Sequence, residues 1–300
     1  MSEAHRVDLG QPTILEFRGP DAVRFLNGQL TQDVRRVSGQ EISLPSCVTD
    51  SKGRLQFRVN LLEIHAGVLW VTGLAEWAEN LEARLTRYLI ADDVEVANLS
   101  ETHRLSHFIG SPGTAPAGVI ARESKRYGIS GMDWWIPCDQ AIKFPDGMDE
   151  LEGDVLEALR ISQKVPAWGR ELLEGMLPPE ALLEETDISY NKGCYIGQEV
   201  ISRIKSAGKV NKYLTHLTFD AEIQLVPGPL ENAQGQVDQA DEAAAPEEEE
   251  VDVSIGGEEI VVRGYLDRNI SKNAPQVVSV LSSADIERTG EGDIAGALSR

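Results

Sequence analysis

Short segments of strand character, separated by a few helical ones, constrain the fold of this chain more than any other feature. Over residues 13–18, apolar and polar side chains alternate, which is the period of a half-buried strand. Over residues 75–90, apolar side chains instead fall on one face at helical spacing. This mixture predicts an α+β fold. Further strands are predicted near 41–48, 54–64, 68–73, 94–99, 103–109, 117–121 and 133–137, and further helices near 20–30, 148–163 and 197–204.

The helix predicted over 75–90 carries two large aromatic residues. Trp77 and Tyr88 share its apolar face with Leu81 and Leu85. Aromatic residues at this spacing usually pack in a hydrophobic core. We therefore expect both rings to be buried.

The character of the chain changes after residue 209. Residues 229–256 are rich in Ala, Gln, Glu and Asp and lack aromatic side chains, which is typical of a disordered insertion. Short strands are expected on either side of it, over 212–219, 259–266 and 275–282. The predicted organisation is an α+β core over 1–209 with two subdomains that divide near 100–112, a small C-terminal β-barrel over 210–285 that carries the insertion, and a flexible tail over 286–300.

The formal net charge of −21 limits the classes of partner. Binding to the phosphates of DNA or RNA needs a basic stripe, so no direct contact with nucleic acid is expected. No apolar run approaches the length of a membrane span, and the first residues do not resemble a signal peptide. The three cysteines lie far apart, without the spacing of a zinc site and one short of the four thiolates of a usual iron–sulfur cluster. We expect a cytoplasmic protein without a metal site or a membrane partner.

One run of eight residues is unusual in its chemistry. Cys194 lies between two glycines, close to Lys192 and just ahead of a predicted helix. Glycines allow another molecule to approach closely, and a neighbouring cation and a helix N-terminus both favour the thiolate. Cys194 is therefore a candidate reactive or ligand-contacting thiol, with Lys192 lowering its pKa; the alternative is a buried, inert thiol. The run reads Lys192-Gly193-Cys194-Tyr195-Ile196-Gly197-Gln198-Glu199.

This run resembles the Lys-Gly-Cys-Tyr-x-Gly-Gln-Glu signature of the YgfZ family of folate-binding, T-protein-like proteins. The likeness continues in register over residues 13–282. The other matching stretches are Gly28-Gln29-Leu30-Thr31-x-Asp33-Val34, Cys47-x-x-Asp50-x-Lys52-Gly53-Arg54, Pro179-Glu180, Ile188-Ser189-Tyr190, and Arg203, Lys205, Gly208, Asn211 and Lys212.

The resemblance implies a T-protein-like (aminomethyltransferase) α+β core with a central pocket, closed by a C-terminal β-barrel. It also implies a folate-binding accessory protein that supports assembly or repair of iron–sulfur enzymes and, through them, tRNA modification by radical iron–sulfur methylthiotransferases. Tetrahydrofolate or a derivative is the implied cofactor. The implied partners are iron–sulfur enzymes or their assembly machinery.

A reduced folate needs an apolar or aromatic slot, an acid or amide to pair with its pterin ring, and a cation for its glutamate tail. Each candidate for these roles also has a structural reading: Asp50 can shape the turn at Gly53, and Glu199 can complement a helix dipole. His103 and His107 fall on a predicted strand without a third metal ligand, so we expect ordinary surface or edge residues there. The cofactor-binding candidates are Asn27, Gln29, Asp33, Asp50, Tyr195, Gln198, Glu199 and Arg203, with Asp133, Lys205 and Lys212 as further ones.

Two other functions remain open. The glycine-cleavage T-protein, an enzyme of similar fold, transfers a one-carbon unit to tetrahydrofolate, but its paired aspartates are replaced here by Gln56 and Phe57. The loss of these carboxylates argues against aminomethyl transfer. Residues 161–166 also depart from the Glu-Ala-Gly that is commoner among YgfZ relatives. The remaining alternative is an interaction module that recruits a basic partner through residues 229–256.

Overall fold

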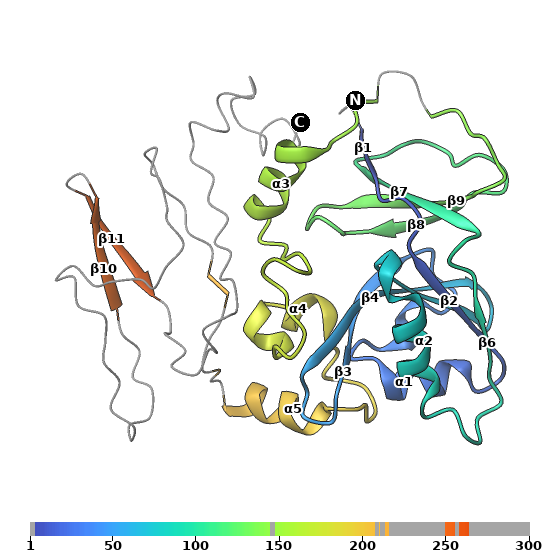
Figure 1. Ribbon diagram of the computed structural model, residues 1–300, viewed down its shortest axis with the longest axis horizontal. Coiled ribbons are helices and arrows are strands. Elements are labelled where there is room, and N and C mark those ends of the chain that lie inside the picture. Colours follow the sequence, from blue (N-terminus) through green and yellow to red (C-terminus); the bar gives the residue numbers. More distant parts are fainter. Residues whose placement is uncertain are drawn as a thin grey trace.

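The computed structural model describes residues 4–144, 148–207, 210, 214–215, 250–255 and 258–263. Two antiparallel sheets form the body of this part of the chain (Figure 1). The first sheet has five strands in the order β3-β4-β5-β2-β6. Its strands are β2 (Thr13–Arg18), β3 (Ser43–Thr49), β4 (Leu55–His65), β5 (Val68–Gly73) and β6 (Glu95–Asn98).

Helices cover one face of the first sheet. Because side chains alternate along a strand, Leu15 and Phe17 of β2 face these helices, whereas Ile14 faces the other way. Leu81 of helix α2 is fully buried against the same apolar cluster. The covering elements are α1 (Ala22–Gln29), the 3₁₀ turns η1 (Val34–Val37) and η2 (Ala75–Trp77), and α2 (Ala78–Thr86).

The second sheet has four strands in the order β1-β7-β9-β8. Helix α3 (Gly153–Ser162) packs on it through Leu159, which contacts the cluster of Val7 and Ile109. The strands of this sheet are β1 (His5–Asp8), β7 (His103–Ile109), β8 (Ile120–Ser124) and β9 (Gly131–Pro137).

The two sheets meet through a small aromatic cluster. Trp70 of the first sheet lies edge-on to Trp135 of the second, with 5.8 Å between ring centroids. Arg122 of β8 crosses the junction and donates hydrogen bonds to the carbonyls of Glu63 and Ile64. These contacts fix the spacing of the two sheets. The two sheets and the helices that pack on them confirm the mixed α and β character that the sequence predicts.

Two expectations about side chains are wrong. The helix that begins near residue 75 ends at Thr86, and Tyr88 is 45% exposed. The guanidinium groups of Arg84 and Arg87 lie over the Tyr88 ring, and such contacts stabilise an aromatic ring at the surface. Trp77 is buried, as expected.

His107 is not a surface or edge residue but is fully buried. The reason is strand β1, which is only four residues long and was not expected. It pairs Val7 with His107 and so converts β7 from an edge strand into an interior one. His103, by contrast, lies at the start of β7 and packs against Trp70.

Outside the two sheets and the helices that cover them, most of residues 163–207 are irregular. No helix among the described residues is long and apolar enough to cross a bilayer. Residues 250–255 form a strand, although the disordered insertion was expected to extend to residue 256. Other predicted segments lie wholly or almost wholly outside the described residues: the rest of that insertion, the strands 212–219 and 275–282, and the tail 286–300. The remaining elements are η3 (Pro178–Ala181), α4 (Glu184–Asp187), α5 (Gln198–Ala207), β10 (Glu250–Ile255) and β11 (Glu258–Arg263).

Candidate functional site

Residues 192–197, called the signature loop below, dock against the end of helix α1. The Lys192 ammonium donates hydrogen bonds to the carbonyls of Leu30 and Gln32, each at 2.7 Å. The backbone amide of Ile196 donates to the Gly28 carbonyl at 3.2 Å. Two stretches that carry the family resemblance, 28–34 and 192–199, are therefore in direct contact.

The third stretch, residues 47–54, completes the same cluster. The Thr49 hydroxyl donates to the Ile196 carbonyl at 2.6 Å. Thr31 and Cys47 exchange two hydrogen bonds, one from the Thr31 amide to the Cys47 carbonyl and one from the Cys47 amide to the Thr31 hydroxyl oxygen. Segments far apart in sequence thus form one hydrogen-bonded unit, with the signature loop at its surface.

Gly197 makes this docking possible. Its φ of +88° lies in the left-handed region that favours glycine. A β-carbon there would lie 2.5 Å from the Asp50 carbonyl oxygen and 2.8 Å from the Gly53 Cα. The signature loop can approach the 50–53 turn only because neither glycine has a side chain.

Lys192 makes its hydrogen bonds to backbone carbonyls inside the cluster. Its ammonium faces the two carbonyls of the α1 end and lies 5.1 Å from the centroid of the Tyr195 ring. Within the described residues, no hydrogen bond joins it to Cys194. Tyr195 is buried, and its hydroxyl has no hydrogen-bond partner there. Lys192 and Tyr195 thus anchor the loop.

We expect Lys192 to make stability depend on pH. Burial lowers the pKa of Lys192 to about 7, whereas an unfolded lysine has a pKa of about 10.4. Between these values the unfolded chain binds the proton and the folded chain does not, so this group's contribution to the free energy of unfolding rises with pH. Urea unfolding measures the free energy of unfolding of the native chain and of Lys192→Met at about pH 6 and about pH 9. The value for the native chain minus that for the variant should be larger at about pH 9.

Lys52→Met, which removes an exposed lysine in the 50–53 turn, is the control for the loss of one charge. If the free energies of unfolding of the native chain and of Lys192→Met differ by the same amount at both pH values, the prediction is contradicted.

The Cys194 thiol is exposed, so the alternative of a buried, inert thiol is wrong for this residue. The preceding glycine keeps its surroundings open, because a β-carbon at Gly193 would meet only the Asn27 amide nitrogen, at 4.0 Å. Cys47 is the buried one, and burial raises its pKa well above the usual value. Among the described residues, no group of three His, Cys, Asp or Glu side chains could hold a metal ion.

Two of the predicted cofactor-binding residues, Asn27 and Gln29, already form side-chain hydrogen bonds within the protein. The Asn27 side-chain oxygen accepts a hydrogen bond from the Val34 amide at 3.1 Å. The Gln29 side-chain oxygen accepts one from Arg84 at 3.0 Å. Both amides therefore hold the end of α1 in place.

The two predicted aspartates have local partners. Asp33 binds Arg35 through both carboxylate oxygens, at 2.9 and 2.8 Å, and this hydrogen bonding lowers the pKa of Asp33. Asp50 accepts hydrogen bonds from the Lys52 and Arg54 amides, both at 2.8 Å, and so shapes the turn. For Asp50 this is the structural role that we weighed against ligand binding.

The last three predicted residues lie on α5. Gln198 and Glu199 occupy its first turn, where an acid complements the helix dipole. Arg203 is exposed. Lys205 lies over the Tyr190 ring, and Lys212 lies outside the described residues.

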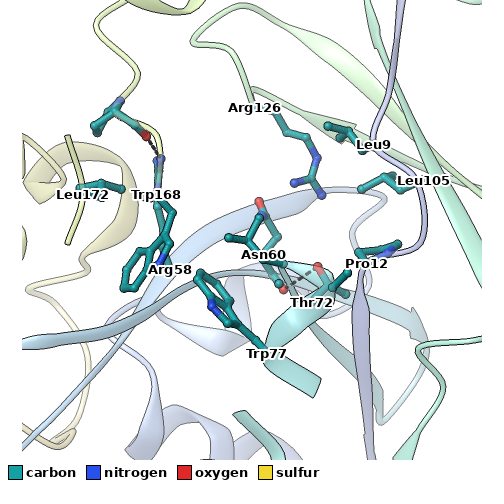
Figure 2. Close-up of a pocket in the computed structure, with 14 residues that line it drawn as sticks. Leu9, Pro12, Arg58, Asn60, Thr72, Trp77, Leu105, Arg126, Trp168 and Leu172 are labelled. Carbon is teal, nitrogen blue, oxygen red and sulfur yellow. Dashed lines mark hydrogen bonds between the residues drawn. The ribbon is translucent and has the colours of Figure 1, made fainter. Parts of the chain in front are cut away.

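A cavity of about 230 Å³ opens between the two sheets. Figure 2 shows the Arg126 guanidinium pointing toward Asn60 and the indole of Trp77 below them. None of the lining residues is an aspartate or a glutamate. The lining residues are Leu9, Pro12, Arg58, Asn60, Thr72, Gly73, Leu74, Ala75, Trp77, Leu105, Arg126, Pro166, Trp168 and Leu172.

A buried ion pair connects the cavity wall to the hydrogen-bonded unit of residues 28–34, 47–54 and 192–197, called the signature cluster below. Arg58 donates to both carboxylate oxygens of Asp187, at 2.7 and 3.1 Å, and to the Pro166 carbonyl at 3.2 Å. The Asp187 side chain is 0% exposed. Its backbone carbonyl in turn accepts from the Thr31 hydroxyl at 2.6 Å. Each of the three Arg58 nitrogens therefore donates one hydrogen bond within the protein, which uses three of its five N–H groups.

Arg126 is held on the opposite wall by another buried carboxylate. Its Nε contacts both oxygens of Asp133 at 2.9 Å, and His107 donates to Asp133 at 2.8 Å. Burial alone would raise the pKa of Asp133, but the Arg126 charge and the His107 hydrogen bond outweigh it and hold the pKa below its usual value. Asp133 is thus a structural partner of Arg126 and does not line the cavity.

None of the ten predicted site residues lines this cavity. Sequence reasoning also missed Arg126, Asn60 and Trp168, which come from a turn, a strand and an irregular segment. Arg58 left no local signal either, because it is one of three polar residues at alternate positions of β4, with Gln56 and Asn60.

No protein-family profile matches the chain. It is 23% identical over 259 residues to the tRNA-modifying protein YgfZ of Cronobacter sakazakii, an alignment that covers 77% of this chain and 75% of that protein. It is 27% identical over 235 residues to the mitochondrial iron–sulfur cluster assembly factor IBA57 of Homo sapiens, covering 69% of this chain and 64% of that protein.

The fold is similar to that of a solved enzyme. The crystal structure of the glycine cleavage system aminomethyltransferase T from Bartonella henselae matches with a TM-score of 0.58 at 16% identity. The match covers 69% of this chain and 64% of that one, so the chain spans less than two thirds of the enzyme's length. This likeness confirms an aminomethyltransferase-like core.

Proposed function

We propose that this chain, a member of the YgfZ family, is a folate-binding accessory protein that supports the assembly or repair of iron–sulfur enzymes and, through them, tRNA modification. The relatives named above are a tRNA-modifying protein and an iron–sulfur cluster assembly factor. We place its action in the cytoplasm, and we keep the C-terminal β-barrel over 210–285 as part of the proposal.

One observation carries this proposal: three of the stretches that resemble the family, residues 28–34, 47–54 and 192–199, meet in a single cluster with the Cys194 thiol at its surface. Residues 28–34 and 47–54 hold the signature loop through hydrogen bonds from Ile196, Lys192 and Thr49. An exposed thiol on a firmly held loop can contact a partner protein or react with an electrophile.

The cavity fits one part of a folate better than the other. Trp77 and Trp168, 4.8 Å apart in an edge-to-face pair, offer an aromatic wall for a flat ring. Arg126 offers a cation for a carboxylate. Acceptors for the pterin ring's N–H groups are scarce, because no carboxylate lines the cavity. Bound tetrahydrofolate would supply or accept one-carbon units.

The alternative, an aminomethyltransferase, finds no support in the two residues that replace the paired aspartates of that enzyme. At the positions of the enzyme's paired aspartates, Gln56 accepts a hydrogen bond from Arg84 and Phe57 packs against Trp77. Neither can take up a proton at neutral pH. An assay with an aminomethylated lipoyl carrier is therefore expected to give no methylene-tetrahydrofolate, and steady production would overturn our ranking of the two functions.

Complementation of a strain lacking the chain tests the role of the thiol. We expect the native chain and Cys138→Ala to restore iron–sulfur enzyme activity and the methylthio modification of tRNA, and Cys194→Ala to leave both at the level of the deletion strain. Cys138 is a matched control because it is also exposed but lies outside the signature cluster, next to Gln11. Full restoration by Cys194→Ala would show that the Cys194 thiol is not needed for the proposed function.

Titration with tetrahydrofolate tests the cofactor separately. Because Trp77 and Trp168 line the cavity, their emission should change as the ligand enters. No change up to about 1 mM ligand would remove folate binding from the proposal.

A further inference from the structure

The surface around the signature loop is basic, although the chain as a whole is acidic. Residues 28–38, 50–54 and 192–205 together carry seven lysines and arginines but only three aspartates and glutamates. The whole chain has 28 of the former and 49 of the latter. Cations that gather against the overall charge of a protein form a face that attracts an acidic partner. The seven are Arg35, Arg36, Lys52, Arg54, Lys192, Arg203 and Lys205.

Two of these cations lie on η1, directly after the residues that Lys192 holds. The Gln32 backbone carbonyl accepts a hydrogen bond from Lys192 at 2.7 Å, and the Gln32 side-chain oxygen accepts one from Arg36 at 3.0 Å. Asp33 neutralises Arg35. Arg36 is exposed and has no carboxylate partner in the part of the chain that the structure describes. It is therefore an uncompensated positive charge beside the signature loop.

The turn after β3 brings two more cations to the loop. A β-carbon at Gly53 would lie 3.1 Å from the Gly197 carbonyl oxygen, so the turn touches the loop. Lys52 and Arg54, on either side of Gly53, are exposed, and neither forms an ion pair within the described ranges. The Asp50 carboxylate accepts hydrogen bonds from the backbone amides of these two residues. Their side-chain charges remain uncompensated.

Helix α5 extends the basic surface on the side of this turn. A β-carbon at Gly53 would lie 3.3 Å from the Val200 Cβ, and Figure 1 shows α5 beside the end of β3. Residues three apart in a helix share a side, which places Arg203 next to the turn. Glu199 is the only exposed acid of the three stretches. The exposed cations without a carboxylate partner among the described residues are called the basic face below: Arg36, Lys52, Arg54 and Arg203.

The distribution of charge favours an acidic protein over a nucleic acid as the partner. A nucleic acid is a long polyanion that needs a continuous basic stripe, and it would extend beyond this face toward the acidic remainder of the chain. An acidic patch on a folded protein is compact. It can match a face of this size, and charges farther away than about 10 Å are largely screened.

We propose that the basic face docks an acidic patch on the surface of a partner protein and so brings this partner to the exposed Cys194 thiol. This inference rests on the proposed function, because the partner is then the iron–sulfur enzyme or assembly protein that the chain serves, and it specifies how that partner is recognised. Complementary charges speed the encounter of two proteins and fix their relative orientation.

Charge reversal on the full chain tests the docking. Fluorescence anisotropy of labelled poly-L-glutamate, an acidic polypeptide, measures binding at about 50 mM and about 200 mM salt. The native chain should bind it, more weakly at the higher salt concentration. Lys52→Glu with Arg54→Glu should weaken binding at least about tenfold, because like charges then face each other. Lys125→Glu with Lys164→Glu, at two exposed lysines outside the face, changes the net charge equally and should bind like the native chain.

Complementation connects the basic face to the proposed function. In a strain lacking the chain, Lys52→Glu with Arg54→Glu should leave iron–sulfur enzyme activity near the level of the deletion strain, and Lys125→Glu with Lys164→Glu should restore it. If the first variant restores activity fully while Cys194→Ala does not, the docking face is wrong and the proposed function stands. If the native chain itself restores nothing, the proposed function fails, and the anisotropy alone decides on the face.

Four binding results would overturn the inference. The native chain does not bind poly-L-glutamate at about 50 mM salt; the control variant loses as much affinity as the reversal; a tRNA transcript binds more tightly than poly-L-glutamate and loses binding on reversal, which assigns the face to RNA; or removal of residues 231–249 raises the affinity for poly-L-glutamate more than about tenfold, which assigns it to the chain's own acidic stretch.

Circular dichroism separates lost binding from lost folding in the reversal variant. If that variant does not fold, Lys52→Gln with Arg54→Gln takes its place. This neutral variant should weaken binding at least about threefold, and unchanged binding would contradict the inference.

Discussion

Gly197→Ala is expected to lower the free energy of unfolding by about 3 kcal/mol, as overpacking against rigid backbone does. The β-carbon would lie 2.5 Å from the Asp50 carbonyl oxygen and 2.8 Å from the Gly53 Cα, and these are backbone atoms that cannot rotate away. The φ of +88° adds strain for any residue with a side chain. The signature loop would have to leave the 50–53 turn, which also breaks the hydrogen bond from Thr49 to Ile196.

Gly193→Ala provides a matched control in the same loop. A β-carbon there meets only one side-chain atom of Asn27, at 4.0 Å, so the expected change is within about 0.5 kcal/mol. Urea unfolding of both variants measures the difference, and limited proteolysis tests whether cleavage of the Gly197→Ala variant begins in residues 192–197. Equal stability of the two variants would show that the loop does not need the close approach at Gly197.

The first sheet could be predicted almost to the residue, and in the second sheet β7 and β9 could be predicted too, whereas β8 was placed three residues early and β1 was missed. Strands β2 and β5 occupy the predicted ranges 13–18 and 68–73, because alternation over six residues is a local signal that one buried face enforces. Strand β1 has only four residues, too few to establish a period. Its pairing with β7 is a long-range event, and missing it placed the buried His107 at an edge.

The candidate site divides in the same way. The family resemblance indicated that residues 28–34, 47–54 and 192–199 matter together, and the hydrogen bonds between them confirm that they are neighbours. The cavity left no local pattern, because its walls come from both sheets and from the irregular segment that holds Trp168. A residue such as Arg126 becomes a candidate only when the topology places its guanidinium opposite Asn60.

Asp187→Ala is expected to lower the free energy of unfolding by about 3 kcal/mol, because it leaves the Arg58 charge, only 21% exposed, without its partner. The Asp187 carboxylate is 0% exposed and accepts hydrogen bonds from Arg58 at 2.7 and 3.1 Å and from Thr186 at 2.6 Å. The variant should also disturb the cavity, since Arg58 lines it, and weaken the link to Thr31 in the signature cluster.

A double-mutant cycle identifies the cause of this loss. Replacing both partners, as in Arg58→Met with Asp187→Ala, removes the orphaned charge along with the pair, so the double variant should be more stable than Asp187→Ala alone. Glu95→Ala is the surface control: Glu95 is 77% exposed and its partner Arg18 is 51% exposed, so this ion pair is expected to be worth no more than about 1 kcal/mol. If the double variant is as unstable as the sum of the two single variants, the penalty comes from lost packing, and the ion pair does not connect the cavity to the signature cluster energetically.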